Sequence, residues 1–308
     1  MTPAAPRVLY VTGWCRSGST LLGNLLNELP GVAHVGELNY LWSNGVLGTG
    51  TNSTCGCGKD LRDCDVWRQV LRELDGHTLA TEMIGLHNTC LRTRFTQERL
   101  REARGLARPP RDVRRVSEVK LRLYTAIGEA LGAQVIVDTS KFPAEAAHLM
   151  GLPDLRPQVL HMVRDPRATA YSWHRAKSYI PAMSPLRSSA YWTGFNAASE
   201  WIARAYPGRC LRLRYEDFAA RPAETIGQVM AWAGLPSPGP VTGGNTVRLG
   251  VNHTVTGNPD RLRTGPVAIR PDDAWRTALP ASSVALSTLA ALPLMSRYGY
   301  RLTRGEYP

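Results

Sequence analysis

Lysine is scarce in this chain of 308 residues, although the chain is strongly basic. The formal net charge at neutral pH is +12, and only four of the 37 basic residues are lysines. Arginine supplies the rest, and it binds phosphate and sulfate groups through paired hydrogen bonds. We therefore expect an anionic ligand, with a base-composition bias of the gene as a second source of the surplus. Nucleic-acid binding is disfavoured, because no recognition helix or zinc-finger pattern accompanies the charge.

Other absences exclude further classes of protein. Six cysteines in a chain this long do not form a disulfide scaffold. No apolar run approaches the ~20 residues that span a bilayer, and the most apolar late segment, 282–295, is predicted to be a packed helix. The first residues lack the charged and then apolar pattern of a signal peptide, so we expect a cytoplasmic location.

Four short apolar runs end in polar residues, and each is followed by a helical pattern. Such strand–turn–helix units, repeated four times, predict an α/β fold with a doubly wound parallel sheet flanked by helices. Ligands of these sheets bind at the carboxyl ends of the strands, here near Gly13, Asp138, Arg164 and Tyr215. The four runs cover residues 7–13, 132–140, 156–166 and 209–218.

Two long segments interrupt this pattern, within what we expect to be one domain over residues 1–308. Residues 39–115 form an insertion after the first strand–helix unit, rich in loop residues at first and then helical and charged. Residues 236–271 are rich in glycine, proline, asparagine and threonine, which predicts a long loop. Loops of this length in compact proteins are commonly lids or binding elements.

The stretch GWCRSGST, residues 13–20, nearly matches the phosphate-binding loop of nucleotide triphosphatases, G-x-x-x-x-G-K-[ST]. Gly13, Gly18 and Thr20 fill their places, but Ser19 replaces the lysine and the cation is Arg16, inside the loop. A glycine-rich turn before a helix aims backbone N–H groups at an anion. The glycines could serve the bend alone, but the order of strand, loop and helix favours a binding site for an anion shorter than a triphosphate.

A second stretch, VRDPRATAYSWHRAK, places Arg164 at the end of a strand and Ser172 two helical turns further on. These two side chains could converge on a second phosphate. The alternative is an ordinary helix start with a proline in its first turn.

Taken together, CRSGSTLL and VRDPRATAYS resemble the sulfotransferase family that uses 3′-phosphoadenosine-5′-phosphosulfate (PAPS), and bacterial members in particular. In that family the first loop holds the 5′-phosphosulfate and an R-D-P-R…S segment holds the 3′-phosphate. Softer similarities are GEL at 36–38, DTSK at 138–141, RYEDF at 214–218 and NHTVTGNPDRLR at 252–263. The resemblance extends from Arg7 to Arg276 and implies a P-loop-like fold.

The resemblance implies roles for individual residues. Arg16 would stabilise the leaving phosphate oxygen, and Lys141 would be a second cation, unless it is a solvated lysine at a helix start. Tyr215 would lie near the adenine, and the late loop would close over the donor. The implied donor-binding residues are Arg16, Ser17, Gly18, Ser19, Thr20, Arg164, Ser172, Tyr215, Asn258, Arg261 and Arg263.

Transfer to a hydroxyl also needs a base for the acceptor proton. We expect Glu37 to be this base, because it matches a glutamate of relatives such as the tyrosylprotein sulfotransferases. Histidine serves in other sulfotransferases, so His34, His174 and His253 remain alternatives. Glu37 could instead belong to a structural ion pair.

The predicted acceptor is a hydroxyl of a small molecule or carbohydrate. A protein tyrosine is disfavoured, because the chain has no secretory signal. The insertion at 39–115 and aromatic residues of the segment 171–201 are expected to line its pocket. These aromatic residues are Trp173, Tyr179, Tyr191 and Trp192.

Arginine and lysine would neutralise the charge that Mg²⁺ neutralises in kinases, so no metal is expected. Two other functions stay open: a P-loop kinase, with Asp138 as the nearest candidate magnesium ligand, and a non-catalytic binder of nucleotides or nucleic acid.

Three cysteines, Cys55, Cys57 and Cys64, are close in sequence. Their C-x-C spacing is a poor match to zinc, even with Cys90 as a fourth ligand, so a tight turn under a substrate lid is expected.

Overall fold

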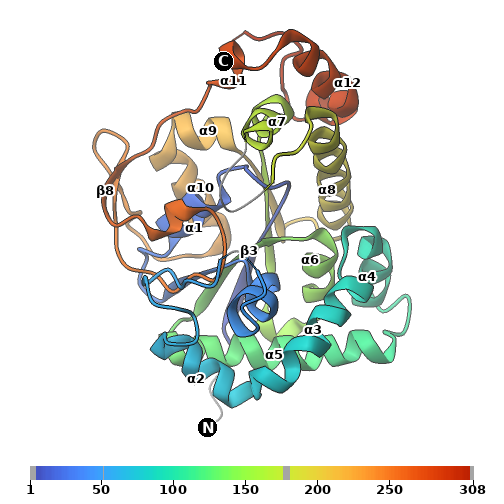
Figure 1. Ribbon diagram of the computed structural model, residues 1–308, viewed down its shortest axis with the longest axis vertical. Helices are drawn as coiled ribbons and strands as arrows, with labels where there is room; N and C mark the ends of the chain where they lie inside the picture. Colours follow the sequence, from blue (N-terminus) through green and yellow to red (C-terminus); the bar gives the residue numbers. More distant parts are fainter. Residues whose placement is uncertain (1–4, 51, 176–180, 306–308) are drawn as a thin grey trace.

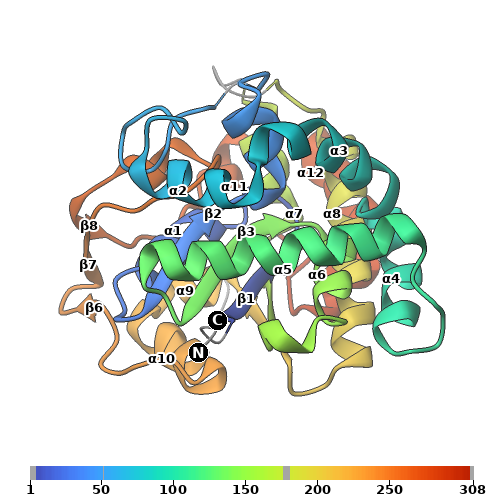
Figure 2. The ribbon, with the colours of Figure 1, turned by 90° about the horizontal axis from the view of Figure 1, so that it is seen from below.

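The computed structural model of the protein describes residues 5–50, 52–175 and 181–305. Its centre is a parallel five-stranded sheet in the order β2-β3-β1-β4-β5, with helices on both faces (Figures 1 and 2). This confirms the predicted α/β fold. The strands are β1 (Arg7–Thr12), β2 (Val32–Gly36), β3 (Val135–Lys141), β4 (Gln158–Val163) and β5 (Cys210–Arg214).

Alternating side chains of the central strand β1 enter the two halves of the core. Leu9 and Val11 pack with α1 (Ser19–Leu26), α9 (Tyr215–Ala220) and α10 (Pro222–Ala233) on one face. Val8 and Tyr10 pack on the other face, where Figure 2 shows the long helix α5 lying across the strands. Because both faces are covered, the central strands β1 and β4 consist mostly of buried apolar residues. The second face is covered by α2 (Asp65–Leu74), α3 (Gly76–Cys90), α4 (Thr96–Ala103), α5 (Arg111–Leu131) and α6 (Pro143–Leu149).

One strand, β2, was not predicted. It holds a buried histidine, His34, whose polar character hides the apolar run. The two imidazole nitrogens are hydrogen-bonded, Nδ1 to Asn24 Oδ1 at 3.1 Å and Nε2 to Thr139 Oγ1 at 3.2 Å. Glu37 therefore directly follows a strand of the sheet.

The glycine- and proline-rich segment 236–271 is more ordered than predicted. It forms a small antiparallel sheet of β6 (Val241–Thr242), β7 (Thr246–Leu249) and β8 (Gly265–Ala268). Its remaining loop returns to the edge of β2, where the N–H of Glu37 donates to Val255 O at 2.9 Å and the N–H of Val255 donates to Val35 O at 2.8 Å. A side chain on Gly36, which has φ 78°, would collide with Val255 O. This contact places the late loop beside Glu37.

The C-terminal part covers the upper end of the molecule in Figure 1. It consists of α11 (Trp275–Ala278) and α12 (Ala281–Arg297), with α12 against α7 (Pro166–His174) and α8 (Pro185–Ala205). None of the helices in the described residues combines the length and apolar character needed to span a bilayer.

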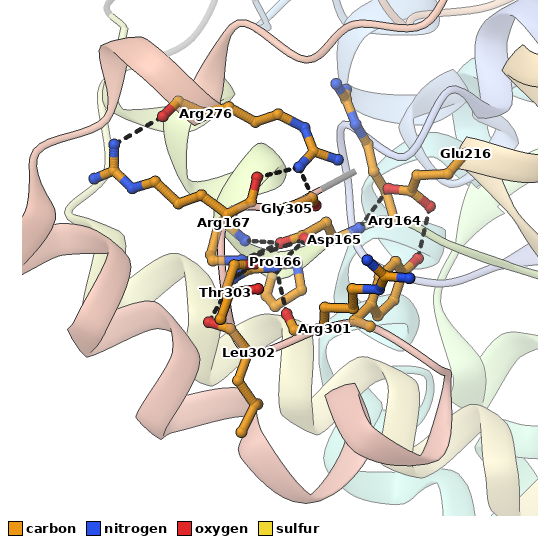
Figure 3. Close-up of polar contacts among 12 residues, drawn as sticks. Arg164, Asp165, Pro166, Arg167, Glu216, Arg276, Arg301, Leu302, Thr303 and Gly305 are labelled. Atoms are coloured by element: carbon orange, nitrogen blue, oxygen red, sulfur yellow. Dashed lines mark hydrogen bonds and ion pairs between the residues drawn. The ribbon is translucent and has the colours of Figure 1, made fainter. Parts of the chain in front are cut away.

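A buried arginine ties the chain end to the sheet (Figure 3). Arg167 pairs with Asp165 at 2.7 Å, and both side chains are fully buried. Its guanidinium also donates to the carbonyl oxygens of Arg301, Leu302 and Thr303 at 2.8–3.1 Å. The second arginine of the R-D-P-R motif is therefore structural.

Replacing Arg167 with methionine should lower the free energy of unfolding by about 3–5 kcal/mol, because the charge of Asp165 would stay buried without the guanidinium that balances it. Urea unfolding measures this loss. Arg221→Met is the matched control, since Arg221 pairs with Glu224 on the surface, and it should cost less than about 1 kcal/mol. Equal losses in the two variants would contradict the structural role of Arg167.

Candidate functional site

A cavity of about 600 Å³ opens at the carboxyl ends of the central strands. Its walls come from the loop after β1, the segment after β2, the ends of β3 and β4, helix α7 and the late loop. It is lined by Cys15, Arg16, Gly18, Ser19, Thr20, Leu21, Glu37, Tyr40, Asn44, Gly50, Asn52, Lys141, Arg164, Tyr171, Ser172, Trp173, Arg175, Tyr215, Thr256, Gly257, Asn258, Asp260 and Asp272.

The loop after β1 needs both of its glycines. Gly13 has φ 124°, and a Cβ there would lie 2.1 Å from Met162 O. A Cβ on Gly18 would lie 2.6 Å from the ring of Tyr215. Gly18 is also the N-cap of α1, and no side chain in the described part of the chain caps this helix. Because the first N–H groups of an α-helix have no partner within the helix, those of α1 could bind an anion in the cavity.

Arg164, at the end of β4, lies next to this loop. Its Nη1 donates to Arg16 O at 3.1 Å, and its guanidinium stacks on Tyr215 with 4.2 Å between the guanidinium carbon and the ring centroid. Arg16 Nε in turn donates to Ser172 Oγ at 3.0 Å. The loop GWCRSGST and the stretch that begins VRDPRATAYS, the two motifs identified in the sequence, are thus in direct contact.

The charge of Arg164 is balanced by Asp272, which the sequence analysis did not identify. Arg164 Nη2 donates to Asp272 Oδ2 at 2.9 Å and to its carbonyl oxygen at 3.0 Å. Another nitrogen of the guanidinium, Arg164 Nε, is buried and has no partner among the described residues. Asp272 lies just beyond the long glycine-rich segment, in a stretch without a motif.

Lys141 and Glu37 form the second charged pair of the cavity. Lys141 Nζ lies 2.5 Å from Glu37 Oε1 and donates to Thr139 O at 2.8 Å. Lys141 is buried and has φ 76°, at an irregular end of the pairing between β1 and β3. The lysine is therefore not a solvated residue at a helix start, and Glu37 does belong to an ion pair.

The three candidate histidines lie outside the cavity lining formed by the described residues. His34 is packed against Gly23, and burial lowers the pKa of its imidazole to about 3. His174 is exposed near the end of α7, and His253 lies among the cysteines. Among the candidate bases, Glu37 is the one that faces the cavity.

Several expected donor-binding residues lie elsewhere. Arg261 is buried and is not among the lining residues, and it donates to Asn52 Oδ1 and Thr54 O at 2.6 Å. Arg263 is exposed and 3.9 Å from Asp260. Ser17 is buried but does not contribute to the lining. Gly18, Ser19, Thr20 and Asn258 do contribute to the lining.

Asp138 is not placed like the magnesium ligand of a kinase. It is fully buried, and its carboxylate accepts hydrogen bonds from Tyr124 Oη at 2.6 Å and from the Ser140 N–H at 2.8 Å. Burial raises the pKa of Asp138 to about 6. The residue is part of the sheet's interior and outside the cavity lining.

The aromatic residues expected in the pocket have different positions. Trp173 lines the cavity, and Tyr191 stacks on Trp14 with centroids 5.0 Å apart. Trp192 is a core residue whose indole donates to Arg164 O at 2.8 Å. Tyr179 lies outside the described residues.

Residues 7–239 match a family model described as "Sulfotransferase family". The chain belongs to the sulfotransferase family.

Two solved structures show the same fold. One is the sulfotransferase domain of an olefin synthase from Synechococcus PCC 7002, with 18% identity, a TM-score of 0.54 and coverage of 98% of both chains. The other is the sulfotransferase domain of the curacin biosynthetic pathway, with 16% identity, a TM-score of 0.54 and coverage of 97% of this chain and 99% of that chain. No curated protein sequence is significantly similar to this sulfotransferase.

Behind Arg164, the carboxyl of Glu216 holds the backbone in place. It accepts hydrogen bonds from the Asp165 N–H and from Tyr300 Oη, both at 2.9 Å (Figure 3). Burial raises the pKa of Glu216 from its ordinary value of 4.5 to about 7. Below pH 4.5 this carboxyl contributes fully to the stability of the fold, and the contribution is lost as the pH rises through about 7.

Glu216→Gln should remove this loss, because glutamine stays neutral and can still accept the Asp165 N–H. The difference in Tm between the variant and the wild type should become more positive as the pH rises from about 5 to about 8.5. Thermal unfolding over this range measures it. Parallel pH profiles would show that Glu216 is not titrating near neutrality.

Proposed function

We propose that this sulfotransferase moves a sulfuryl group from PAPS to a hydroxyl of a small-molecule or carbohydrate acceptor. The strongest support for this proposal is the position of Arg164. This residue joins the glycine-rich loop to Tyr215, and its buried donor Nε has no partner among the described residues. An anion beside it would satisfy that donor. As expected from the sequence, the proposed location of the protein is the cytoplasm.

The residues of the cavity fit such a donor at two separate anionic groups. The uncapped start of α1, with Ser19 and Thr20, suits the 5′-phosphosulfate. Arg164 and Ser172 suit the 3′-phosphate, and the ring of Tyr215 suits the adenine. When bound, PAPS would supply a sulfuryl group on a phosphate leaving group.

Cations at the other end of the cavity would stabilise the charge that develops on the leaving oxygen. Arg16 belongs to the loop itself, and Lys141 enters from β3. Because Lys141 holds Glu37 Oε1, we assign Oε2 of Glu37 to the proton of the acceptor hydroxyl. The ion pair then orients the base and keeps the lysine close to the reacting group.

The insertion supplies Tyr40, Asn44 and Asn52 to the cavity, and α7 supplies Tyr171 and Trp173. Amide and phenol groups beside an indole ring suit a hydroxylated acceptor with an apolar or sugar face. A transfer assay with sulfur-labelled PAPS and a panel of phenols, sugars and alcohols tests the reaction directly. Label transferred to a hydroxyl supports the proposal, and no transfer to any class of acceptor counts against it.

Arg164→Ala should weaken the binding of adenosine 3′,5′-bisphosphate roughly 10- to 150-fold. This follows from a charged hydrogen bond of about 1.5–3 kcal/mol. Calorimetric titration measures the change, and circular dichroism verifies the fold. Arg248→Ala is the control, because Arg248 is exposed on β7 and should bind like the wild type. Unchanged binding by Arg164→Ala would remove Arg164 from the donor site.

Glu37→Gln should reduce turnover about 10²–10⁴-fold, since glutamine cannot take the acceptor proton. Binding of adenosine 3′,5′-bisphosphate should stay within about threefold, because the amide oxygen can still accept from Lys141. Glu118→Gln, on an exposed helix face, is the control and should keep full activity. Full activity in Glu37→Gln would assign the base elsewhere.

A further inference from the structure

Four potential metal ligands meet on the insertion, outside the cavity lining. Cys55, Cys57 and Cys64 come from the turn before α2, and His253 comes from the late loop nearly 190 residues further along the chain. Their four ligand atoms all lie within 4.8 Å of one another. His253 Nδ1 is 3.2 Å from Cys64 Sγ and 3.7 Å from Cys55 Sγ.

The two sulfur–nitrogen distances are close to those of a tetrahedral metal site. Ligand distances of about 2.3 Å for sulfur and about 2.0–2.1 Å for nitrogen place sulfur and nitrogen about 3.6 Å apart around such an ion, and two sulfurs about 3.8 Å apart. The two measured sulfur–nitrogen distances lie on either side of the first value. The fourth ligand that the C-x-C spacing lacked is thus a histidine. It is not Cys90, which packs at the end of α3 with Leu91, Val113 and Val116.

We propose that Cys55, Cys57, Cys64 and His253 bind a structural zinc ion. Three thiolates and one imidazole are a zinc ligand set, and sulfur ligands select against magnesium, calcium and manganese. Four protein ligands fill a tetrahedral shell and leave no position for substrate. The ion therefore has no part in the transfer reaction, and this inference does not rest on the proposed function.

The surrounding backbone is built around these side chains. The Cys55 N–H donates to Lys59 O at 2.8 Å, and the Gly58 N–H donates to Cys55 O at 2.9 Å, which closes a tight turn. Cys55 and Cys64 are fully buried. The indole of Trp67 donates to the carbonyl oxygen of His253 at 2.8 Å and fixes the histidine from behind. Such outer contacts orient metal ligands.

The zinc ion would join two loops that both reach the cavity. The Gly56 N–H donates to Thr254 O at 2.9 Å, and Arg261 donates to Thr54 O at 2.6 Å. The first loop supplies Asn52 to the cavity, and the second supplies Thr256 to Asn258. The metal would therefore hold the insertion and the late loop together over the site.

The first test is metal analysis of the 308-residue protein, loaded with Zn²⁺ under reducing conditions and dialysed against metal-free buffer. The wild type should retain about one zinc ion per chain. Cys64→Ser should lower the affinity for Zn²⁺ by more than the roughly 10–100-fold that loss of an outer contact costs. Cys210→Ser is the matched control, because Cys210 lies at the start of β5, far from the cluster, and it should retain the ion.

The second test keeps Cys55, Cys57 and Cys64 in place, so it does not depend on the folding of a protein that lacks one of them. Co²⁺ bound to the wild type should give the visible absorption of a tetrahedral thiolate site, and His253→Cys should keep the ion with a shifted spectrum. A wild-type protein with reduced thiols that binds neither Zn²⁺ nor Co²⁺ would overturn the proposal. A disulfide among Cys55, Cys57 and Cys64, found by mass spectrometry of the protein without reductant, would overturn it as well.

Discussion

The contact between Arg164 and the backbone of the glycine-rich loop is the interaction on which the cavity depends. It brings the end of β4 to the loop after β1, and the stacked ring of Tyr215 brings in the end of β5. Gly18 must be a glycine because that ring lies against it. Behind this contact, the buried pair of Asp165 and Arg167 fixes the strand end to the C-terminal segment. Residues far from the cavity therefore hold its geometry.

The cavity also contains two buried cations, Arg164 and Lys141, whose charges are balanced by carboxylates. A buried cation is costly unless a partner compensates it. Asp272 compensates Arg164, and Glu37 compensates Lys141. The two cations thus lie in the cavity as two separate pairs, one on each side of the glycine-rich loop. This arrangement suits a ligand with two anionic groups better than a single run of phosphates.

Features of the protein that depend on local sequence patterns could be predicted from the sequence. The glycine-rich loop, the R-D-P-R stretch and four of the five parallel strands follow from apolar runs and from glycine and proline positions. Strand β2 was not predicted, because the buried His34 interrupts its apolar pattern. Asp272 was not predicted either, because no motif surrounds it in the sequence. Arg261 was expected to bind the donor, but this arginine joins two loops. The meeting of His253 with the cysteines depends on chain folding over nearly 190 residues, which no local spacing reveals.

The proposed donor requires that the cavity recognise a nucleotide by a 3′-phosphate as well as a 5′-phosphate. Calorimetric titration of the purified protein with adenosine 3′,5′-bisphosphate, run beside ADP, measures this preference. The bisphosphate is expected to bind at least about tenfold more tightly than ADP, because only the bisphosphate has a 3′-phosphate that would reach Arg164. Equal affinities for the two nucleotides would contradict the assignment of Arg164 and Ser172, and with it the proposed donor.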